Sequence, residues 1–145
     1  MNIRKATYDD LARIAEIEIF NYRLHFYPIF RNDDFYFADL TVPAQMESVK
    51  PRLPNLWVYD DGVVKGFLEA ENQEVKKLFV EPVLQGQSIG AELLKYAIRE
   101  MDVRTLWALE KNTRAIAFYQ RHGFRLTKDK KLEEDTTEYL VRMER

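Results

Sequence analysis

The chain has no cysteine among its 145 residues. This absence excludes a disulfide framework, a thiolate metal site and a cysteine nucleophile. Histidine occurs only twice, at positions 25 and 122, and two residues so far apart in the sequence are too few to predict a zinc centre. We therefore expect no metal site, and chemistry that does not depend on a thiol.

The chain also lacks a strong excess of charge and a long apolar run. It has 22 basic and 24 acidic residues, a formal net charge of −2 and a sequence pI of about 5.8. This balance predicts no overall attraction to nucleic acid or to an anionic membrane. No segment has the length of a membrane span, and the first residues have no signal-peptide apolar region. We expect a cytoplasmic protein that binds neither nucleic acid nor membrane.

The hydrophobic content of 46% and the aromatic content of 13% are enough for a sizeable core. No linker, repeat or low-complexity segment divides the chain, so we expect one domain over residues 1–145. Alternating and helical apolar periodicity predicts an α/β arrangement. Helices are expected at residues 8–23, 42–49, 88–98 and 112–123, and strands at 2–6, 56–59, 63–70, 75–80, 105–110, 124–127 and 139–143, with a charged, mobile connection at 128–137.

The most informative segment runs from Val80 to Ala91, where a strand is followed by a turn and a helix. β-Branched and aromatic residues predict the strand, which Pro82 ends because proline cannot donate to a ladder. Apolar residues then recur at helical spacing from Ile89, so a helix begins near Ser88.

Gly86 and Gly90 lie in this turn, where glycine lets the backbone approach a ligand closely. The first amides of the helix have no partner within the helix and point toward the turn, which predicts an anion site, most naturally for a pyrophosphate. A nucleotide P-loop is excluded because Ala91 and Glu92 follow Gly90 in place of Lys and Ser or Thr. A dinucleotide fingerprint is excluded because Ile89 stands where its third glycine belongs.

A second informative segment follows about twenty residues later. Residues 105–110 read as a short buried strand, and residues 111–124 as a helix. Asn112 or Thr113 is the expected N-cap, and Gly123 is the expected left-handed residue at the C-terminal end.

Together the two segments resemble the GCN5-related N-acetyltransferases. The acetyl-CoA loop of that family reads Gln or Arg, two residues, Gly, one residue, then Gly or Ala, and the stretch from Gln85 to Gly90 differs from it only at Ser88. The family most often has glycine there, whereas a serine is a candidate helix cap or an obstacle to close phosphate approach. The Asn, Ala, Phe-Tyr and Gly-Phe of the second segment occur at the family's spacing, and the resemblance covers roughly residues 74–126.

The resemblance implies the acyl-CoA N-acyltransferase fold, a mixed and mostly antiparallel sheet flanked by about four helices. It also implies that acetyl-CoA is the cosubstrate. In the family the pantetheine arm pairs with the strand before the loop, and an Asn contacts the cofactor. The residues expected to bind acetyl-CoA are Leu78, Phe79, Val80, Gln85, Gly86, Gln87, Ser88, Ile89, Gly90, Ala91 and Asn112.

The implied reaction is acetyl transfer to a primary amine, and the absence of cysteine favours direct attack over an acetyl-enzyme. By resemblance Tyr119 is the general acid, since a phenol with a pKa near ~10 is protonated at neutral pH. Glu74 is our first choice as general base, with Glu69, Glu71 and Glu110 as alternatives. Each of these carboxylates has a simpler interpretation as a solvated charge at a strand end, and Tyr119 has one as a core aromatic.

The sequence does not distinguish a small molecule from a peptide as the acceptor of the acetyl group. The aromatic residues between positions 22 and 37 are either core or the wall of an acceptor pocket, and the acidic residues at 33, 34 and 39 favour a cationic acceptor. His25 and His122 are expected to be surface or cap residues. The alternative function is a non-catalytic acyl-CoA-binding regulatory or interaction domain, and a homodimer through the edge of the closing strands is plausible.

Overall fold

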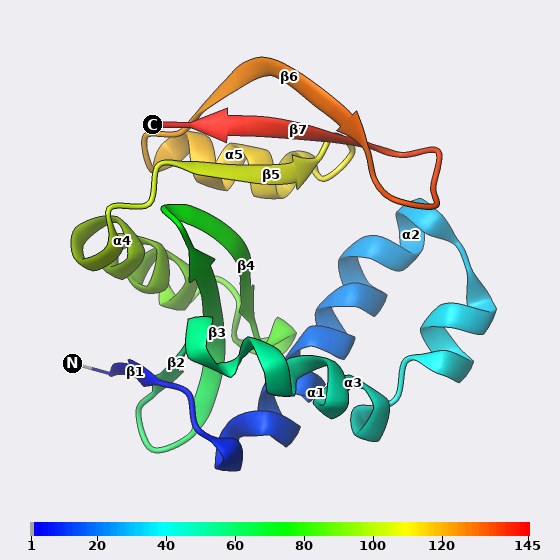
Figure 1. Cartoon of the computed structure of the whole chain (residues 1–145), viewed down its shortest axis with the longest axis vertical. Coiled ribbons are helices and arrows are strands. Elements are labelled where there is room, and N and C mark those ends of the chain that lie inside the picture. The colour runs from blue at the N-terminus through cyan, green and yellow to red at the C-terminus, as the bar shows by residue number, and fades with distance from the viewer. Residues whose placement is uncertain (1) are drawn as a thin grey trace.

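The computed structural model describes residues 2–145 and contains a seven-stranded sheet with the order β1-β2-β3-β4-β5-β7-β6 (Figure 1). Neighbouring strands are antiparallel except β4 and β5, which are parallel. The expected mostly antiparallel α/β fold is confirmed. The strands are β1 (Ile3–Lys5), β2 (Leu56–Asp60), β3 (Val64–Glu71), β4 (Glu74–Val80), β5 (Thr105–Leu109), β6 (Arg125–Leu132) and β7 (Tyr139–Glu144).

The two faces of the sheet carry different helices, as the burial of neighbouring residues in β3 shows. Phe67 packs with α1 (Leu11–Asn21) and α3 (Val42–Val49), whereas Leu68 packs with α4 (Ile89–Met101) and α5 (Thr113–Arg121). Successive side chains of a strand point to opposite faces, so β3 is buried on both sides. The strand is therefore the central element of the core.

The segment between α1 and α3 is helical. It contains π-helical turns at residues 22–26 and 34–39 and the short helix α2 (Tyr27–Phe30). Tyr36 is the buried side chain of these turns, and Phe35 and Phe37 are exposed. Tyr22 and Phe26 pack edge-on against Phe79 of β4. We call residues 22–39 the aromatic hood.

The last strand pair differs from the expectation. Residues 128–132 belong to strand β6 and are not part of a charged connection, which is reduced to the turn at residues 133–138. β6 lies at the edge of the sheet, and its charged residues suit an edge strand because they discourage pairing with another chain. Alternation of apolar residues is weak in such a strand, which explains why the sequence pattern missed it.

The hairpin between β2 and β3 is confirmed, with Gly62 at a φ of 114° in its turn. Among the helices described between residues 2 and 145, none is long and apolar enough to cross a membrane.

Candidate functional site

The sheet opens between its two parallel strands. β4 and β5 are paired only at Glu74 with Thr105 and at Val75 with Leu106, and the strands then separate. β4 has a bulge at Lys76, which lies between the residue pairs Ala70–Val75 and Glu69–Lys77 of β3 and β4. Such a bulge bends its strand. Figure 1 shows β5, β7 and β6 diverging from β4 as a separate upper part of the sheet. The divergence leaves one edge of β4 without a partner strand.

The hydrogen-bond pattern tells which residues of β4 face this free edge. The amide of Glu81 donates to the carbonyl of Lys65 on the β3 side at 2.9 Å. Backbone groups alternate in direction along an antiparallel strand, so Phe79 also faces β3, whereas Leu78 and Val80 face the gap. Of the three residues expected along a pantetheine arm, Leu78 and Val80 thus offer backbone groups and Phe79 does not.

The turn after β4 leads directly into α4, as predicted. Gly86 has a φ of 89° and nothing within 4 Å of an added Cβ, so the turn is open at this point. Ser88 occupies the N-cap position of α4, but it has a left-handed φ of 67° and its side chain makes no cap hydrogen bond. Of the two alternatives for Ser88, the helix cap is therefore not formed, because this backbone conformation turns the residue away from the geometry of a normal N-cap. The first amides of α4 stay available for an anion.

A polar contact chain ties this turn to the first helix. Asn21 is buried, and its side-chain nitrogen donates to the carbonyl of Val80 at 2.8 Å. The side-chain oxygen of Asn21 therefore faces Gln85 and accepts from Nε2 of Gln85 at 3.1 Å. The same Gln85 nitrogen lies 3.4 Å from Nε2 of His25. An amide nitrogen only donates, so the ring nitrogen accepts and the imidazole carries its proton on Nδ1. Burial and the positive charge of Arg114 lower the pKa of His25, which favours this neutral form.

The second motif forms α5 with the predicted ends. Asn112 is the N-cap, and its side chain accepts from the amide of Ala115 at 3.3 Å. Gly123 follows the helix with a φ of 94°. Tyr119 packs edge-on against Phe124, with ring centroids 5.9 Å apart. Burial raises the pKa of Tyr119, so its hydroxyl keeps its proton at neutral pH.

One cavity of about 1340 Å³ brings these features together. It reaches from the turn at residues 85–91 along β4 to the aromatic hood, and Asn112 and Tyr119 of the α5 segment line it. Among the expected residues, Gln87 and Glu74 are not in its lining. His122 is the C-cap residue of α5, in agreement with the expected cap position, and both histidines also line the cavity. The lining includes Tyr22, His25, Phe26, Phe30, Tyr36, Lys77, Leu78, Phe79, Val80, Gln85, Gly86, Ser88, Ile89, Gly90, Ala91, Arg114, Phe118, Arg121 and His122.

Glu74 lies at the paired end of β4, opposite Thr105. Its carboxylate contacts the ammonium of Lys76 at 3.3 Å. Of the other candidate bases, Glu69 is paired with Arg52, and Glu110 with Lys130. Glu71 lies opposite Glu74 at the end of β3 and is outside the cavity lining. The acidic residues that line the cavity are Glu133, Glu134, Asp135 and Glu138 of the β6–β7 turn. Figure 1 shows this turn next to α2.

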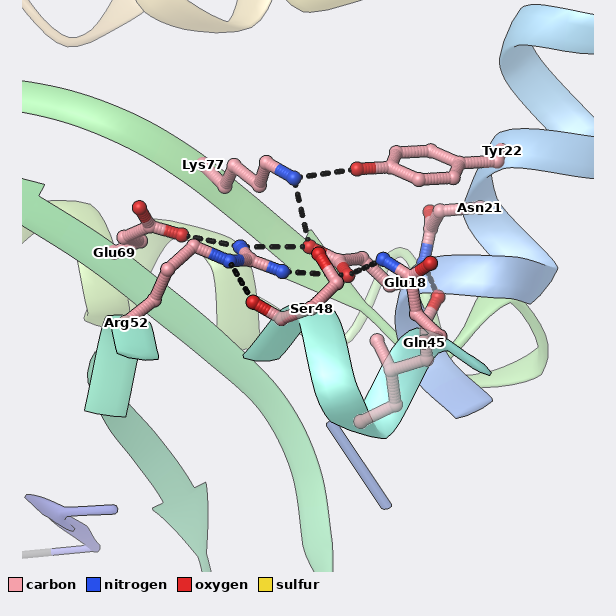
Figure 2. A network of polar contacts seen from close by, with 9 residues as sticks. Glu18, Asn21, Tyr22, Gln45, Ser48, Arg52, Glu69 and Lys77 are labelled. Atoms are coloured by element: carbon pink, nitrogen blue, oxygen red, sulfur yellow. Dashed lines mark hydrogen bonds and ion pairs between the residues drawn. The ribbon is translucent and has the colours of Figure 1, made fainter. Parts of the chain in front are cut away.

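A buried network of charges supports the wall of the cavity (Figure 2). Glu18 of α1 is fully buried and accepts from Arg52 at 3.0 and 3.1 Å, from Lys77 at 2.9 Å, and from Gln45. These hydrogen bonds hold the pKa of Glu18 below its usual value in spite of its burial. Glu69 accepts from Arg52 at 2.5 Å, so two carboxylates balance two cations.

The network reaches the cavity at the end of the Lys77 side chain. Its ammonium donates to the hydroxyl of Tyr22 at 2.5 Å, and both residues line the cavity. Figure 2 shows Lys77 from β4 and Tyr22 from the aromatic hood pointing toward each other. The network thus fixes the hood to the strand that borders the open edge.

Sequence reasoning missed His25, Lys77, Arg114 and Arg121 as cavity residues. The two arginines had a usable signal, because helical periodicity places both on the face of α5 that carries Phe118. For His25 and Lys77 the sequence contains no comparable signal, since their partners lie 60 and 59 positions away.

Comparisons with known proteins agree with this geometry. A model of the acetyltransferase (GNAT) domain matches residues 53–126, just over half of the chain. Peptidyl-lysine N-acetyltransferase YjaB of Salmonella typhimurium is 34% identical over 79 residues, which are 53% of this chain and 54% of that protein. The chain spans about half to two thirds of the length of the curated relatives it matches.

Solved structures show the same fold over nearly the whole chain. The solution structure of apo YjaB from Escherichia coli has a TM-score of 0.75 at 22% identity and covers 98% of this chain and 95% of that one. The PaiA N-acetyltransferase of Thermoplasma acidophilum, solved with coenzyme A, has a TM-score of 0.70 at 17% identity and covers 99% and 98%. With the domain match over residues 53–126, the chain belongs to the GNAT acetyltransferase domain family.

Proposed function

We propose that this protein transfers the acetyl group of acetyl-CoA to a primary amine by direct attack of the amine on the thioester. The observation that carries the proposal is one cavity that joins an unpaired strand edge, an uncapped helix N-terminus and a protonated tyrosine. The strand edge suits the amide groups of a pantetheine arm, and the helix N-terminus suits a pyrophosphate. The PaiA structure with coenzyme A supports the same cofactor class.

In the proposed complex the chain binds acetyl-CoA through its backbone. Leu78 offers both peptide groups to the arm and Val80 offers its amide, because the Val80 carbonyl is already bonded to Asn21. The open turn at Gly86 and the first amides of α4 hold the phosphates. Asn112 uses its side-chain oxygen as a helix cap, so its side-chain amide is the group left to contact the cofactor.

Acetyl-CoA supplies the activated thioester. The nitrogen of the neutral acceptor amine forms the new bond to the carbonyl carbon while the carbon–sulfur bond breaks. The nitrogen passes its proton to water, and Tyr119 donates its own proton to the departing sulfur and is then reprotonated from water. The raised pKa of Tyr119 keeps this donor protonated at working pH. Glu74 lies outside the cavity lining, and the proposed reaction does not include it.

The acceptor side of the cavity lies beneath the aromatic hood. Aromatic side chains there suit an apolar portion of the acceptor, and the acidic β6–β7 turn suits its cationic amine. YjaB is named a peptidyl-lysine N-acetyltransferase, and a lysine side chain combines an apolar stem with an amine. Lysine-containing peptides are therefore the first acceptors to test.

The first test compares cofactor binding in two variants at Gly86 by calorimetric titration with acetyl-CoA. Gly86→Asp and Gly86→Asn have nearly the same size and suffer the same backbone strain at this left-handed position, but only the first adds a negative charge. We expect Gly86→Asp to bind at least about tenfold more weakly than Gly86→Asn. Equal affinities for the two variants would place the phosphates elsewhere.

The second test measures release of the free thiol in the presence of lysine-containing peptides. We expect Tyr119→Phe to keep the affinity for acetyl-CoA and to lower kcat by about 100-fold, as for loss of a general acid. An unchanged kcat would remove Tyr119 from the reaction. Tight binding of acetyl-CoA without thiol release, whichever amine is offered, would favour the non-catalytic binding domain.

A further inference from the structure

The aromatic hood contains a buried tyrosine whose hydroxyl has no hydrogen-bond partner. Tyr36 is only 5% exposed, and its ring packs edge-on against Tyr27 and Phe35. Its backbone is bonded within the hood, where the amide donates to Asn32 and the carbonyl accepts from Arg23. Within residues 2–145 nothing hydrogen-bonds the hydroxyl, whereas every polar side-chain atom closed off from solvent has a partner. The Tyr36 hydroxyl therefore opens into the cavity, which this residue lines.

A carboxylate faces this hydroxyl from the opposite wall of the cavity. The negative charge of Glu133, on the β6–β7 turn, helps to raise the pKa of Tyr36, yet no hydrogen bond joins the two side chains. Figure 1 shows this turn beside α2 of the hood. The amide of Glu133 donates to the carbonyl of Glu138 at 2.8 Å, and its carbonyl accepts from the amide of Thr136 at 3.1 Å, so the turn is fixed. A phenol and a carboxylate thus border one gap between two distant segments of the chain.

The charge of Glu133 is not balanced by the protein. Glu138 of the same turn is paired with Lys111 at 2.6 Å. Within residues 2–145 the carboxylate of Glu133 accepts only from the amide of Glu134, at 3.1 Å, and forms no ion pair. Arg23, a cation of the hood, donates to backbone carbonyls of the hood instead. Glu133 is therefore available for a cation from outside the chain.

We propose that Tyr36 and Glu133 bind a second cationic group of the acceptor, an ammonium or guanidinium that is separate from the amine to be acetylated. The inference rests on the proposed function, because it names a substrate class for that reaction, acceptors with two basic groups. The N–H groups of such a cation can donate to the phenol oxygen and to the carboxylate at once. Phe35 lines the same end of the cavity, and aromatic rings attract cations.

The chemistry of the reaction explains why this group is not the attacking amine. The turn attracts the acceptor as a cation, but the nitrogen that attacks the thioester has to be neutral. A carboxylate beside that nitrogen would favour its protonated form. Glu133 therefore suits a group that stays charged throughout the reaction.

The test compares acceptors that differ only in the second charge. Peptides with a blocked amino terminus and a single lysine carry either arginine or citrulline, its uncharged isostere, at successive positions beside the lysine. Pentane-1,5-diamine and pentylamine form the corresponding small-molecule pair. We expect kcat/KM for thiol release to be about tenfold higher for the charged member, as for a charge-assisted hydrogen bond. A preference in the peptide pairs alone would assign the subsite to peptides, and one in the diamine pair alone would assign it to small amines.

Substitutions at the two residues separate their contributions. Tyr36→Phe removes only the hydroxyl and should reduce the preference to about threefold, whereas Glu133→Gln removes the charge and should reduce it to about twofold. The double variant should abolish the preference. Glu100→Gln is the matched control, because Glu100 is exposed, pairs with Arg99 and is not in the cavity lining. This variant removes the same charge and should keep the wild-type preference.

Binding to the coenzyme A complex gives a readout that does not need turnover. The backbone amide signals of residues 133–138 should shift at about tenfold lower concentrations of the arginine peptide than of the citrulline peptide. Equal kcat/KM and equal shifts for both members of every pair, or a preference that survives in the double variant, would overturn the subsite and leave the proposed function intact. Lack of thiol release with every amine would instead refute the proposed function, and the inference with it.

Discussion

The charge network around Glu18 makes a quantitative prediction for stability. Replacing Glu18 by Gln removes the carboxylate that accepts from Arg52 and Lys77 and leaves these two cations with Glu69 alone. Breaking a buried ion pair from one side costs about 3–5 kcal/mol, a large part of the ~5–15 kcal/mol that stabilises a typical domain. For a chain of this size the melting temperature should fall by about 10–15 °C.

A double-mutant cycle distinguishes the coupling between Glu18 and Lys77 from the loss of the separate contacts of each side chain. Lys77→Met alone leaves one excess negative charge, whereas Glu18→Gln with Lys77→Met restores neutrality around Arg52 and Glu69. The double variant should therefore be more stable than the sum of the single effects predicts, by about 1–3 kcal/mol. Urea unfolding at pH 7, followed by circular dichroism, measures each free energy. Additivity within about 0.5 kcal/mol would show that Glu18 and Lys77 are not coupled.

The same network predicts the pH dependence of the Glu18→Gln effect. The folded-state pKa of Glu18 is lowered, so the unfolded chain takes up the proton first as pH falls. The stabilisation from Glu18 is then fully present above its unfolded pKa of about 4.3 and is lost as pH falls through the lower folded value. Wild type and Glu18→Gln should converge in stability in acid, and a gap that is constant from pH 7 to pH 3 would contradict the assignment.

Three further predictions concern single positions. Ser88→Gly should stabilise the fold by about 1 kcal/mol in thermal unfolding, because glycine adopts the left-handed φ of 67° without strain; a loss of stability would contradict this. Gly66→Ala should destabilise it by about 1–3 kcal/mol, since a Cβ there would lie 2.9 Å from the carbonyl oxygen of Phe79, and a neutral effect would show that the strands can separate. Asp10→Asn should lower stability at pH 7 but not near pH 2, because the hydrogen bond from Arg4 lowers the pKa of Asp10 and its contribution is lost as pH falls through that value; an unchanged difference at both pH values would argue against it.

Local sequence signals predicted the elements that position the site. The turn at residues 85–90 and the cap residue Asn112 depend on spacing within one helix or turn, and such spacing is visible along the chain. Apolar periodicity likewise predicted β2, β3 and β4 to within a residue or two. For these elements local propensity and tertiary structure agree.

Other features were hidden because they depend on contacts between distant residues or on backbone conformation. The contact between Glu18 and Lys77 joins residues 59 positions apart, and the tautomer of His25 depends on Asn21 through Gln85. The left-handed conformation of Ser88 overrides the usual capping preference of serine. Glu74 was chosen from its place on the strand, but the divergence of β4 and β5 begins beyond it, on the far side of the Lys76 bulge.

An NMR titration of the isotope-labelled protein with coenzyme A, followed through its backbone amides, tests whether the cofactor binds between β4 and β5. The largest shifts should belong to Leu78 and Val80 on the free edge of β4 and to Gly86 and Gly90 in the phosphate turn, and Phe79 should be much less affected because its amide faces β3. Shifts of these amides at saturating coenzyme A would establish the cofactor site in the splayed sheet. An unchanged spectrum, or shifts confined to residues outside the cavity, would contradict it.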